Sequence, residues 1–516
     1  MPTSRTLALL LLANPLVATA QPAPSERIQG SNHYTDTVLV ANTPELEPLV
    51  MVDPLLGNAW GLAIRPPGAG GHFWISNFNS GTTTTYVGDA HKPDGTFMPL
   101  FQDDLMQVRI PIGAGKREDG PPIVPISQPT GQVFNHSSSD FVVSGEGITA
   151  ASKFIFVTAE GTISGWTEIK DPATGVLRRQ TSSVITIDQS ALYHDDRLRF
   201  TGCAVTDLPR DNRLYVTNFI ENRVEVYDAA WSRVELPAGR FMYPDQPGNF
   251  HIWNIQYFRT GPEGEGRLWG VYAMMEEPWE EDPDFGAIAE FDLEGNFIRR
   301  FTTSMDTDPY ADSELKAPWG IAIAPDDFGP LSNCMIVANF GNGTLPAFDL
   351  ATGDFVDWVR DNSGEIMSVD GVWGILFGNG VALGDTNALY YAAGPRSEFD
   401  GTFGSVRHTP STCPTIERQP ESVTLSAGQR SAELSIHAPG PVRSTHQWQT
   451  ELNPGQWSDL SDGLLDGGTS IHGSQTPRLR LSAIDRHSSV RYRCVVTNAC
   501  GSIISEPAAV TISEAR

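Results

Sequence analysis

A short pattern that recurs six times along the chain constrains its fold more than any other feature. Its clear copies join an apolar residue, tryptophan and glycine, followed by a turn and further strand-like segments. Clear copies stand at Trp60-Gly61, Trp319-Gly320 and Trp373-Gly374, and weaker copies begin at Glu146-Gly147, Thr201-Gly202 and Trp253-Asn254. Spacings of roughly 50 to 90 residues with several short strands per unit are typical of β-propellers. The sequence therefore predicts an all-β fold with a six-bladed β-propeller over residues 33–408.

An alternating segment before the first full repeat indicates how such a propeller would close. Residues 34–40 read Tyr-Thr-Asp-Thr-Val-Leu-Val and alternate as a strand does. We expect this strand to complete the last blade, because pairing there removes two open sheet edges. A long insertion with a loop-like centre at residues 113–122 separates the first two repeats.

The composition suits a turn-rich β protein and excludes several kinds of partner. Apolar residues make up 40% of the 516 residues, with 49 glycines and 38 prolines. The 35 Lys and Arg against 62 Asp and Glu give a net charge of −27. This charge repels phosphate backbones, so we expect no nucleic-acid partner. After the first twenty residues no apolar run reaches membrane-spanning length, so we expect no membrane span in the mature chain.

The first twenty residues have the pattern of a signal peptide. Arg5 supplies a positive charge, residues 7–13 form an apolar core, and Ala18-Thr19-Ala20 fits a cleavage site before Gln21. We therefore expect cleavage near Ala20, a linker over residues 21–32, and a secreted or periplasmic protein.

The chain beyond a linker at residues 409–414 has the pattern of an immunoglobulin-like β-sandwich over residues 415–516. Trp448 stands where the tryptophan of strand C is expected, and Tyr492 precedes Cys494 by two residues, as in strand F. The usual strand-B cysteine is missing, and Ile436 stands near its place, so Ile436 is expected to pack on Trp448.

Five cysteines remain to be assigned. The start of the first strand and the loop after strand F lie at the same end of this topology, so a disulfide between Cys413 and Cys500 is reasonable. Cys494 is then expected to be a buried thiol, and Cys203 and Cys334 to behave as small buried hydrophobes. The sequence has no Cys-x-x-Cys or His cluster that would indicate zinc.

The segment over residues 33–408 resembles an uncharacterised family of secreted bacterial six-bladed propellers, whose members often end in a PEP-CTERM sorting tail. The segments that carry the resemblance are residues 58–62, 128–135, 161–166, 317–325, 339–343, 370–374 and 387–395. The resemblance implies an NHL-like or TolB-like propeller architecture and no particular activity. Residues 510–516 lack a hydrophobic tail, and the last hundred residues resemble a bacterial immunoglobulin-like module instead.

The residue before each repeat glycine (or before Asn254) is the candidate ligand-binding position. It is occupied by Trp60, Glu146, Thr201, Trp253, Trp319 and Trp373. In the gluconolactonase-like propellers that the repeats resemble at the level of fold, this position faces the central tunnel, and Glu, Asn and Asp there bind a divalent cation. Here the tryptophans have two interpretations: core packing between blades, or an aromatic-lined channel mouth that stacks on flat apolar groups such as sugar rings.

An acidic segment offers the one candidate for a cation. Residues 276–285 contain six carboxylates, which could hold Ca²⁺, but two prolines and the lack of EF-hand spacing favour a solvated loop. We therefore assign no cofactor or metal ligand, with Ca²⁺ kept as the alternative.

Two functions remain open from the sequence. The first is a secreted, non-catalytic binding or adhesion protein whose ligand, an extracellular molecule or cell-surface glycan, binds at the tryptophan-lined mouth. The second is a lactonase-like hydrolase or a lyase that uses Glu146 with a metal or with His251, because acid–base catalysis needs two groups within reach of one substrate. The sequence contains no motif for nucleophilic catalysis.

Overall fold

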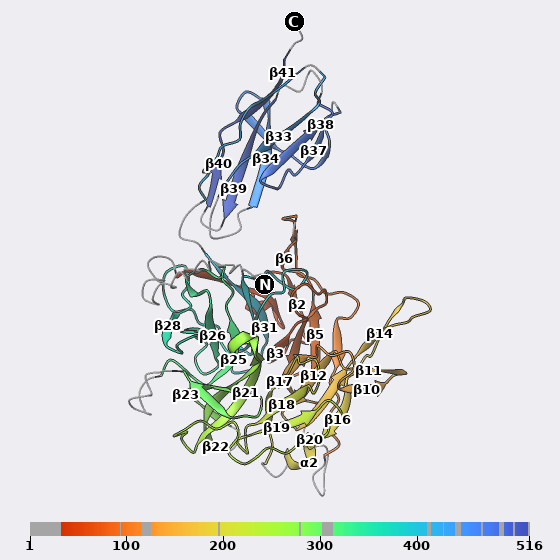
Figure 1. Cartoon of the computed structure of the whole chain (residues 1–516), viewed down its shortest axis with the longest axis vertical. Helices are drawn as coiled ribbons and strands as arrows, with labels where there is room; N and C mark the ends of the chain where they lie inside the picture. The colour runs from red at the N-terminus through yellow and green to blue at the C-terminus, as the bar shows by residue number, and fades with distance from the viewer. Residues whose placement is uncertain are drawn as a thin grey trace, which may run out of the picture.

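The computed structural model is almost entirely β-sheet, which confirms the predicted all-β class (Figure 1). It describes residues 32–92, 94–115, 125–193, 197–277, 280–301, 313–409, 414–426, 428–438, 445–465, 468–484, 490–498 and 501–513. The helical segments in these ranges are one-turn pieces: η1 (Pro44–Leu46), α2 (Ser190–Tyr193), η2 (Pro262–Gly264) and η4 (Gly329–Leu331).

Between residues 32 and 409, six sheets of four or five strands follow one another along the chain, and their strands pair antiparallel except for β1 with β2. The first sheet contains β3 (Ala59–Ala63), β4 (Phe73–Asn77), β5 (Thr82–Tyr86) and β8 (Gln107–Arg109). The second contains β9 (Pro129–Phe134), β12 (Phe154–Thr158), β13 (Thr162–Trp166) and β16 (Val184–Asp188). The third contains β17 (Phe200–Val205), β18 (Arg213–Asn218), β19 (Arg223–Asp228) and β20 (Arg233–Val234). The next two are β21 (Phe250–Phe258), β22 (Arg267–Glu277), β23 (Glu280–Phe291) and β24 (Phe297–Arg300); and β25 (Pro318–Ile323), β26 (Cys334–Asn339), β27 (Pro346–Asp349) and β28 (Phe355–Trp358). The sixth is β29 (Val372–Phe377), β30 (Ala388–Ala393), β31 (Thr402–His408), β1 (Tyr34–Ala41) and β2 (Met51–Val52).

Three small hairpins lie outside these sheets. They are β6 (Ala90–His91) with β7 (Phe97–Met98), β10 (Val142–Gly145) with β11 (Ile148–Ala151), and β14 (Glu168–Lys170) with β15 (Leu177–Arg179).

The first strands of the six sheets contact one another in chain order. β3 packs on β9, β9 on β17, β17 on β21, β21 on β25, β25 on β29, and β29 again on β3. The repeat glycines make this close approach possible: a Cβ on Gly374 would lie 2.6 Å from the Trp60 carbonyl oxygen, and one on Gly61 would overlap the Thr130 carbonyl oxygen. Glycine therefore recurs there because neighbouring backbones leave no room for a side chain.

The N-terminal strand completes the sixth sheet, as predicted for residues 34–40. β1 pairs antiparallel with β31, from Tyr34 opposite His408 to Ala41 opposite Thr402. Tyr34 is fully buried, and its hydroxyl donates a 2.8 Å hydrogen bond to the Phe328 carbonyl. The first and last strands of this part of the chain are thus held in one sheet.

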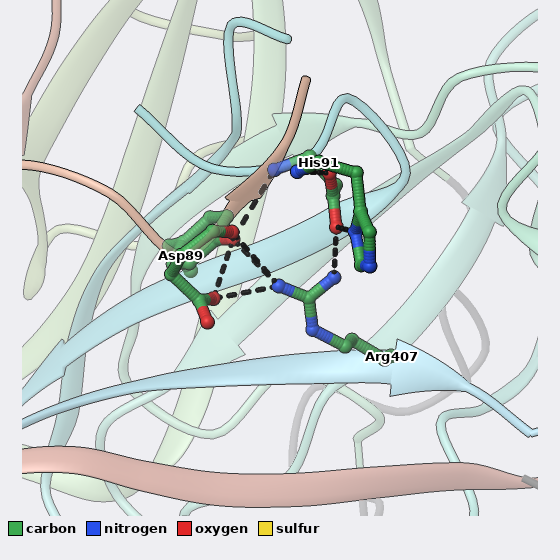
Figure 2. A network of polar contacts seen from close by, with 5 residues as sticks. Asp89, His91 and Arg407 are labelled. Carbon is green, nitrogen blue, oxygen red and sulfur yellow. Dashed lines mark hydrogen bonds and ion pairs between the residues drawn. The ribbon is translucent and has the colours of Figure 1, made fainter. Parts of the chain in front are cut away.

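A buried polar network fastens the sixth sheet to the hairpin that follows β5 (Figure 2). The guanidinium of Arg407 on β31 makes 2.6 Å ion pairs with both Asp89 and Asp385. The Tyr390 hydroxyl on β30 donates to Asp89 at 2.7 Å, and His91 on β6 contacts Asp385 at 2.9 Å. Because both carboxylates are almost fully buried, their charges depend on Arg407.

The strands after residue 416 form two sheets of their own, shown in blue in Figure 1. One contains β32 (Val423–Leu425), β41 (Ala508–Ile512), β39 (Val490–Asn498), β34 (Thr445–Asn453), β35 (Gln456–Asp459) and β40 (Gly501–Ile504); the other contains β33 (Ser431–Ser435), β38 (Arg478–Ser482), β37 (Ser470–His472) and β36 (Gly463–Leu464). This strand order is immunoglobulin-like. Trp448, Ile436 and the Cys494 thiol share its buried core, as expected.

Some predictions concern residues that the structure does not describe. The signal peptide, most of linker 21–32 and both Cys413 and Cys500 lie outside the described ranges, so the disulfide and the domain limits stay predictions. Cys203 and Cys334 are buried, as expected. Of the acidic segment, residues 276–277 end β22 and residues 280–285 lie in β23, so these described parts are strands and not a plain loop. No helix in the described residues is long and apolar enough to cross a membrane.

We expect Arg407→Met to destabilise the protein by about 3 kcal/mol, because it leaves the buried Asp89 and Asp385 carboxylates without their cation. Urea unfolding followed by tryptophan fluorescence measures the loss. The matched control is Arg396→Met, which breaks the exposed pair with Asp400 and should cost less than about 1 kcal/mol. Equal effects of the two substitutions would contradict the role given to the network.

The same network predicts a sign for the dependence of stability on pH. Burial would raise the pKa of Asp385, but hydrogen bonds from His91 and the charge of Arg407 lower it to about 2. Because this folded-state pKa lies below the unfolded value of about 4, the stabilisation is present above pH ~4 and is lost as pH falls through ~2. Wild type should therefore exceed Asp385→Asn in unfolding free energy near neutrality, and the gap should shrink in acid. A gap that is independent of pH would refute this.

Candidate functional site

Four of the six predicted ligand-binding residues come together where the first strands meet. Trp60 stacks on Trp373 with ring centroids 3.8 Å apart, Trp319 lies edge-on 6.1 Å from both, and Trp253 lies 5.3 Å from Trp373. These four residues, here called the tryptophan cluster, are at most 5% exposed. The cluster is thus an apolar core shared by four sheets.

Phenylalanines that the sequence analysis did not select complete this core. Phe340 stacks on Trp373 at 3.9 Å, Phe78 on Trp60 at 5.5 Å, and Phe219 lies 5.8 Å from Trp253. Each follows the last residue of the second strand in its sheet, and each is preceded by asparagine. The repeated Asn-Phe dipeptide after a strand was a signal from which these residues could have been found.

Hydrogen bonds fix three of the four indole rings of the cluster. The Asn58 side-chain oxygen accepts from the indole N–H of Trp60 at 3.0 Å and from that of Trp373 at 3.1 Å. Trp319 donates to the Thr201 carbonyl at 3.0 Å, and the Thr201 hydroxyl donates to the Trp253 carbonyl at 2.5 Å. The Trp253 indole nitrogen has no hydrogen-bond partner in the described part of the chain.

The burial of these rings favours core packing over an open aromatic mouth. A ring that lines a mouth would expose a face to solvent, whereas Trp60, Trp253 and Trp373 expose at most 1% of their surface. Thr201 is also fully buried and joins the Trp319 indole N–H to the Trp253 backbone carbonyl. Trp319 differs from the other three tryptophans of the cluster, because it lines a cavity.

A cavity of about 230 Å³ lies directly beyond the cluster along the same first strands. We call it the central cavity. It is bounded by Trp319 and by residues of five first strands, among them Leu62, Gln132, Cys203, Gln256 and Leu376. Most of its polar side chains are committed to neighbouring strands: Gln132 donates to the Gly61 carbonyl at 2.7 Å, and Gln256 accepts from the Ile321 N–H at 2.7 Å. The remaining wall is largely apolar.

Polar residues gather at the outer limit of the central cavity. His136 and Tyr257 line it there, and the Tyr257 hydroxyl donates to Asp207 at 2.7 Å. Partial burial would raise the pKa of Asp207, but hydrogen bonds from Arg259 and Tyr257 lower it. Burial lowers the pKa of His136, so this ring is neutral near pH 7.

The placement of Glu146 at the channel is a correction. The second sheet begins with β9, where Thr130 precedes Gly131, and Glu146 instead occupies the exposed turn between β10 and β11. Both Glu146 and Gly147 have left-handed backbones, with φ of 51° and 71°. This glycine therefore serves a tight turn and not the close approach of two first strands.

Glu146 and His251 lie in different parts of the fold and have different hydrogen-bond partners. Slight burial would raise the pKa of Glu146, but hydrogen bonds from Thr181 and Ser182 lower it below its usual value. His251 lies on β21 beside the tryptophan cluster, where Nδ1 contacts the Phe219 carbonyl at 2.6 Å and burial lowers its pKa. The structure therefore does not bring the two candidate catalytic residues together.

Neither the described side chains nor a family model identifies a metal or an activity. No group of three or more His, Cys, Asp or Glu residues in the described ranges is arranged to hold a metal ion. No family model matches the sequence.

The curated relatives that cover most of the chain are uncharacterised viral proteins. Uncharacterized protein R648 of Acanthamoeba polyphaga mimivirus is 26% identical over 367 residues, which cover 69% of this chain and 76% of that protein. Uncharacterized protein L690 of the same virus is 24% identical over 69% of this chain and 81% of its own length. The bacterial family with a PEP-CTERM tail is therefore the wrong expectation, since these relatives point to a viral family.

Three further comparisons are more limited. Endoglucanase C of Cellulomonas fimi is 31% identical over 112 residues, which cover 22% of this chain and 9% of that protein. The titin M3 domain matches 20% of this chain and its own full length, with 20% identity and a TM-score of 0.16. Sidekick-1 immunoglobulin domains 1–5 match 86% of this chain and 85% of theirs, with 11% identity and a TM-score of 0.18. Such low TM-scores carry no argument.

We expect Trp373→Ala to destabilise the protein by about 3–5 kcal/mol, because the ring is packed between Trp60 and Phe340 and its loss leaves a large cavity. Thermal or urea unfolding measures this. Phe399→Ala is the control, since that ring is 80% exposed and should contribute less than about 0.5 kcal/mol. A small loss at Trp373 would show that the cluster is not a structural core.

Proposed function

We propose that the six sheets form a six-bladed β-propeller, joined to the immunoglobulin-like domain, and that this propeller is a non-catalytic binding module. Two features support the propeller: the contacts of successive first strands return to β3, and β1 completes the sheet that contains β29. A propeller is the arrangement in which such sheets surround one axis and leave no long open edge.

The central cavity is the single observation that carries the binding function. It lies on the proposed axis, and its floor is Trp319, the one member of the tryptophan cluster that borders it. A largely apolar, concave site with a few polar groups at its edge is the usual form of a ligand site. At about 230 Å³ it accepts a single ring or one unit of a longer ligand rather than a drug-sized molecule.

A glycan is the first ligand class to test. An indole stacks on the C–H face of a sugar ring, and His136 and Tyr257 at the outer limit offer hydrogen-bonding groups. The short similarity to an endoglucanase agrees with this choice but covers too little of that enzyme to suggest its activity.

We expect Leu62→Trp to abolish ligand binding, because the larger side chain fills the cavity from its partly exposed wall. Binding is measured on a glycan array with the full chain, and native mass spectrometry detects a ligand retained through purification. The control is Leu49→Trp, which adds the same ring at a site that is 70% exposed and away from the cavity.

Folding of both variants is checked by circular dichroism. If folded Leu62→Trp keeps the glycan binding or retained ligand of wild type, the cavity is not the site and the proposal fails. If wild type itself retains no ligand and binds no glycan, the proposed ligand class is wrong.

A further inference from the structure

The opposite end of the tryptophan cluster carries a strained turn that the proposed binding site does not use. Between β30 and β31, three successive residues, Arg396, Ser397 and Glu398, have left-handed φ angles of 57°, 56° and 65°. None is glycine, so each costs roughly 1 kcal/mol or more. Strain of this kind persists where surrounding contacts enforce it, and here the Arg396 N–H donates to Asp370 at 2.9 Å.

This left-handed turn places a carboxylate against the edge of the cluster. The Asn58 amide donates to the Glu398 carboxylate at 2.6 Å, while its oxygen accepts from both Trp60 and Trp373. Because two indole N–H groups occupy that oxygen, the amide can present only its donor to Glu398. The Asn79 amide also donates to the Glu398 carbonyl at 2.7 Å. The carboxylate is therefore fixed relative to the stacked rings.

Aromatic and apolar side chains that pack on the tryptophan cluster remain partly exposed. Phe78 stacks on Trp60, Phe340 stacks on Trp373, and Ile220 and Met275 pack on the same cluster. All four are half-buried, whereas the tryptophans beneath them are closed to solvent. This face of the cluster thus combines accessible phenyl rings with one fixed negative charge.

The charge of Glu398 depends on its burial and on its neighbours. Burial raises the pKa of Glu398, while the Asn58 hydrogen bond and the Arg199 charge act in the opposite direction. Arg396, the other nearby cation, forms its ion pair with Asp400 at 3.1 Å. The chain as a whole carries −27, which draws cations to its surface.

We propose that this face binds an organic ammonium group, with Glu398 as its counter-charge and Phe78, whose backbone N–H donates to the Asn58 carbonyl at 3.1 Å, as its aromatic contact. The face of an aromatic ring attracts a desolvated cation, and a tetraalkylammonium or alkylammonium group can cover apolar surface while it meets a carboxylate. The site lies beyond the N-terminal ends of the first strands, so the tryptophan cluster separates it from the central cavity. The two sites can therefore be tested independently.

The test uses choline and its neutral isostere 3,3-dimethylbutan-1-ol, titrated into the full chain by calorimetry and tryptophan fluorescence. Wild type should prefer choline by about tenfold, as a cation–π contact with a carboxylate would give. Glu398→Gln should remove this preference, and Glu365→Gln, which removes one charge from an exposed turn, should keep it. Equal affinity of wild type for the two probes would overturn the proposal.

A second variant guards against a folding defect in Glu398→Gln. Phe78→Leu keeps apolar bulk but removes a ring, so choline binding should weaken several-fold while binding of the neutral isostere stays unchanged. Choline affinity should also fall between neutral and acidic pH, as Glu398 becomes protonated. Choline binding that is unchanged in folded Phe78→Leu, or constant over this pH range, counts against the site.

Butylammonium then distinguishes the kind of ammonium. Preference for choline assigns a quaternary group, and preference for butylammonium assigns a primary amine such as a lysine side chain. If Leu62→Trp abolishes glycan binding but leaves choline binding intact, the two sites are separate. Loss of choline binding in Leu62→Trp would place the cation in the central cavity and overturn this assignment.

Discussion

The close contact of neighbouring first strands is the constraint on which the remaining structure depends. The repeat glycines let one backbone touch the next, as where a Cβ on Gly374 would come within 2.6 Å of the Trp60 carbonyl. Trp60, Trp319 and Trp373 each stand directly before such a glycine and fill the space where the strands converge. The glycine thus prevents overlap between two backbones, and the tryptophan fills the space beside them, since protein interiors tolerate neither overlap nor voids.

The fourth repeat shows the same constraint met by different chemistry. Asn254 stands where the other repeats have glycine, and its amide donates to the Trp319 carbonyl of the next first strand at 2.8 Å. Gly202, on the preceding strand, faces the Asn254 side chain, which occupies the space that a Cβ would need. A hydrogen bond here replaces direct backbone contact.

Much of this organisation could be predicted because tryptophan, glycine and strand alternation recur in the sequence. The all-β class, the pairing of residues 34–40 with the last sheet and the core around Trp448 followed from such local patterns. The second repeat could not be placed in this way, because Gly131 and Gly147 both follow a polar residue. Only the folded chain shows that Gly131 serves the close contact of two strands and that Gly147 serves a turn. The burial of the tryptophans also depended on Phe78, Phe219 and Phe340, which come from different strands.

The pairing of β1 with β31 has a mechanical consequence. Tyr34 lies opposite His408, so the chain enters β1 and leaves β31 at the same end of the ladder. Tension between the N-terminal segment and the immunoglobulin-like domain would load these hydrogen bonds one after another, as a zipper opens, and not all at once in shear. Arg407 lies one residue from that end and forms ion pairs with Asp89 and Asp385. These ion pairs would therefore come under load early in the separation of the two strands. The two strands would therefore separate at a lower force than strands of the same length that are loaded in shear.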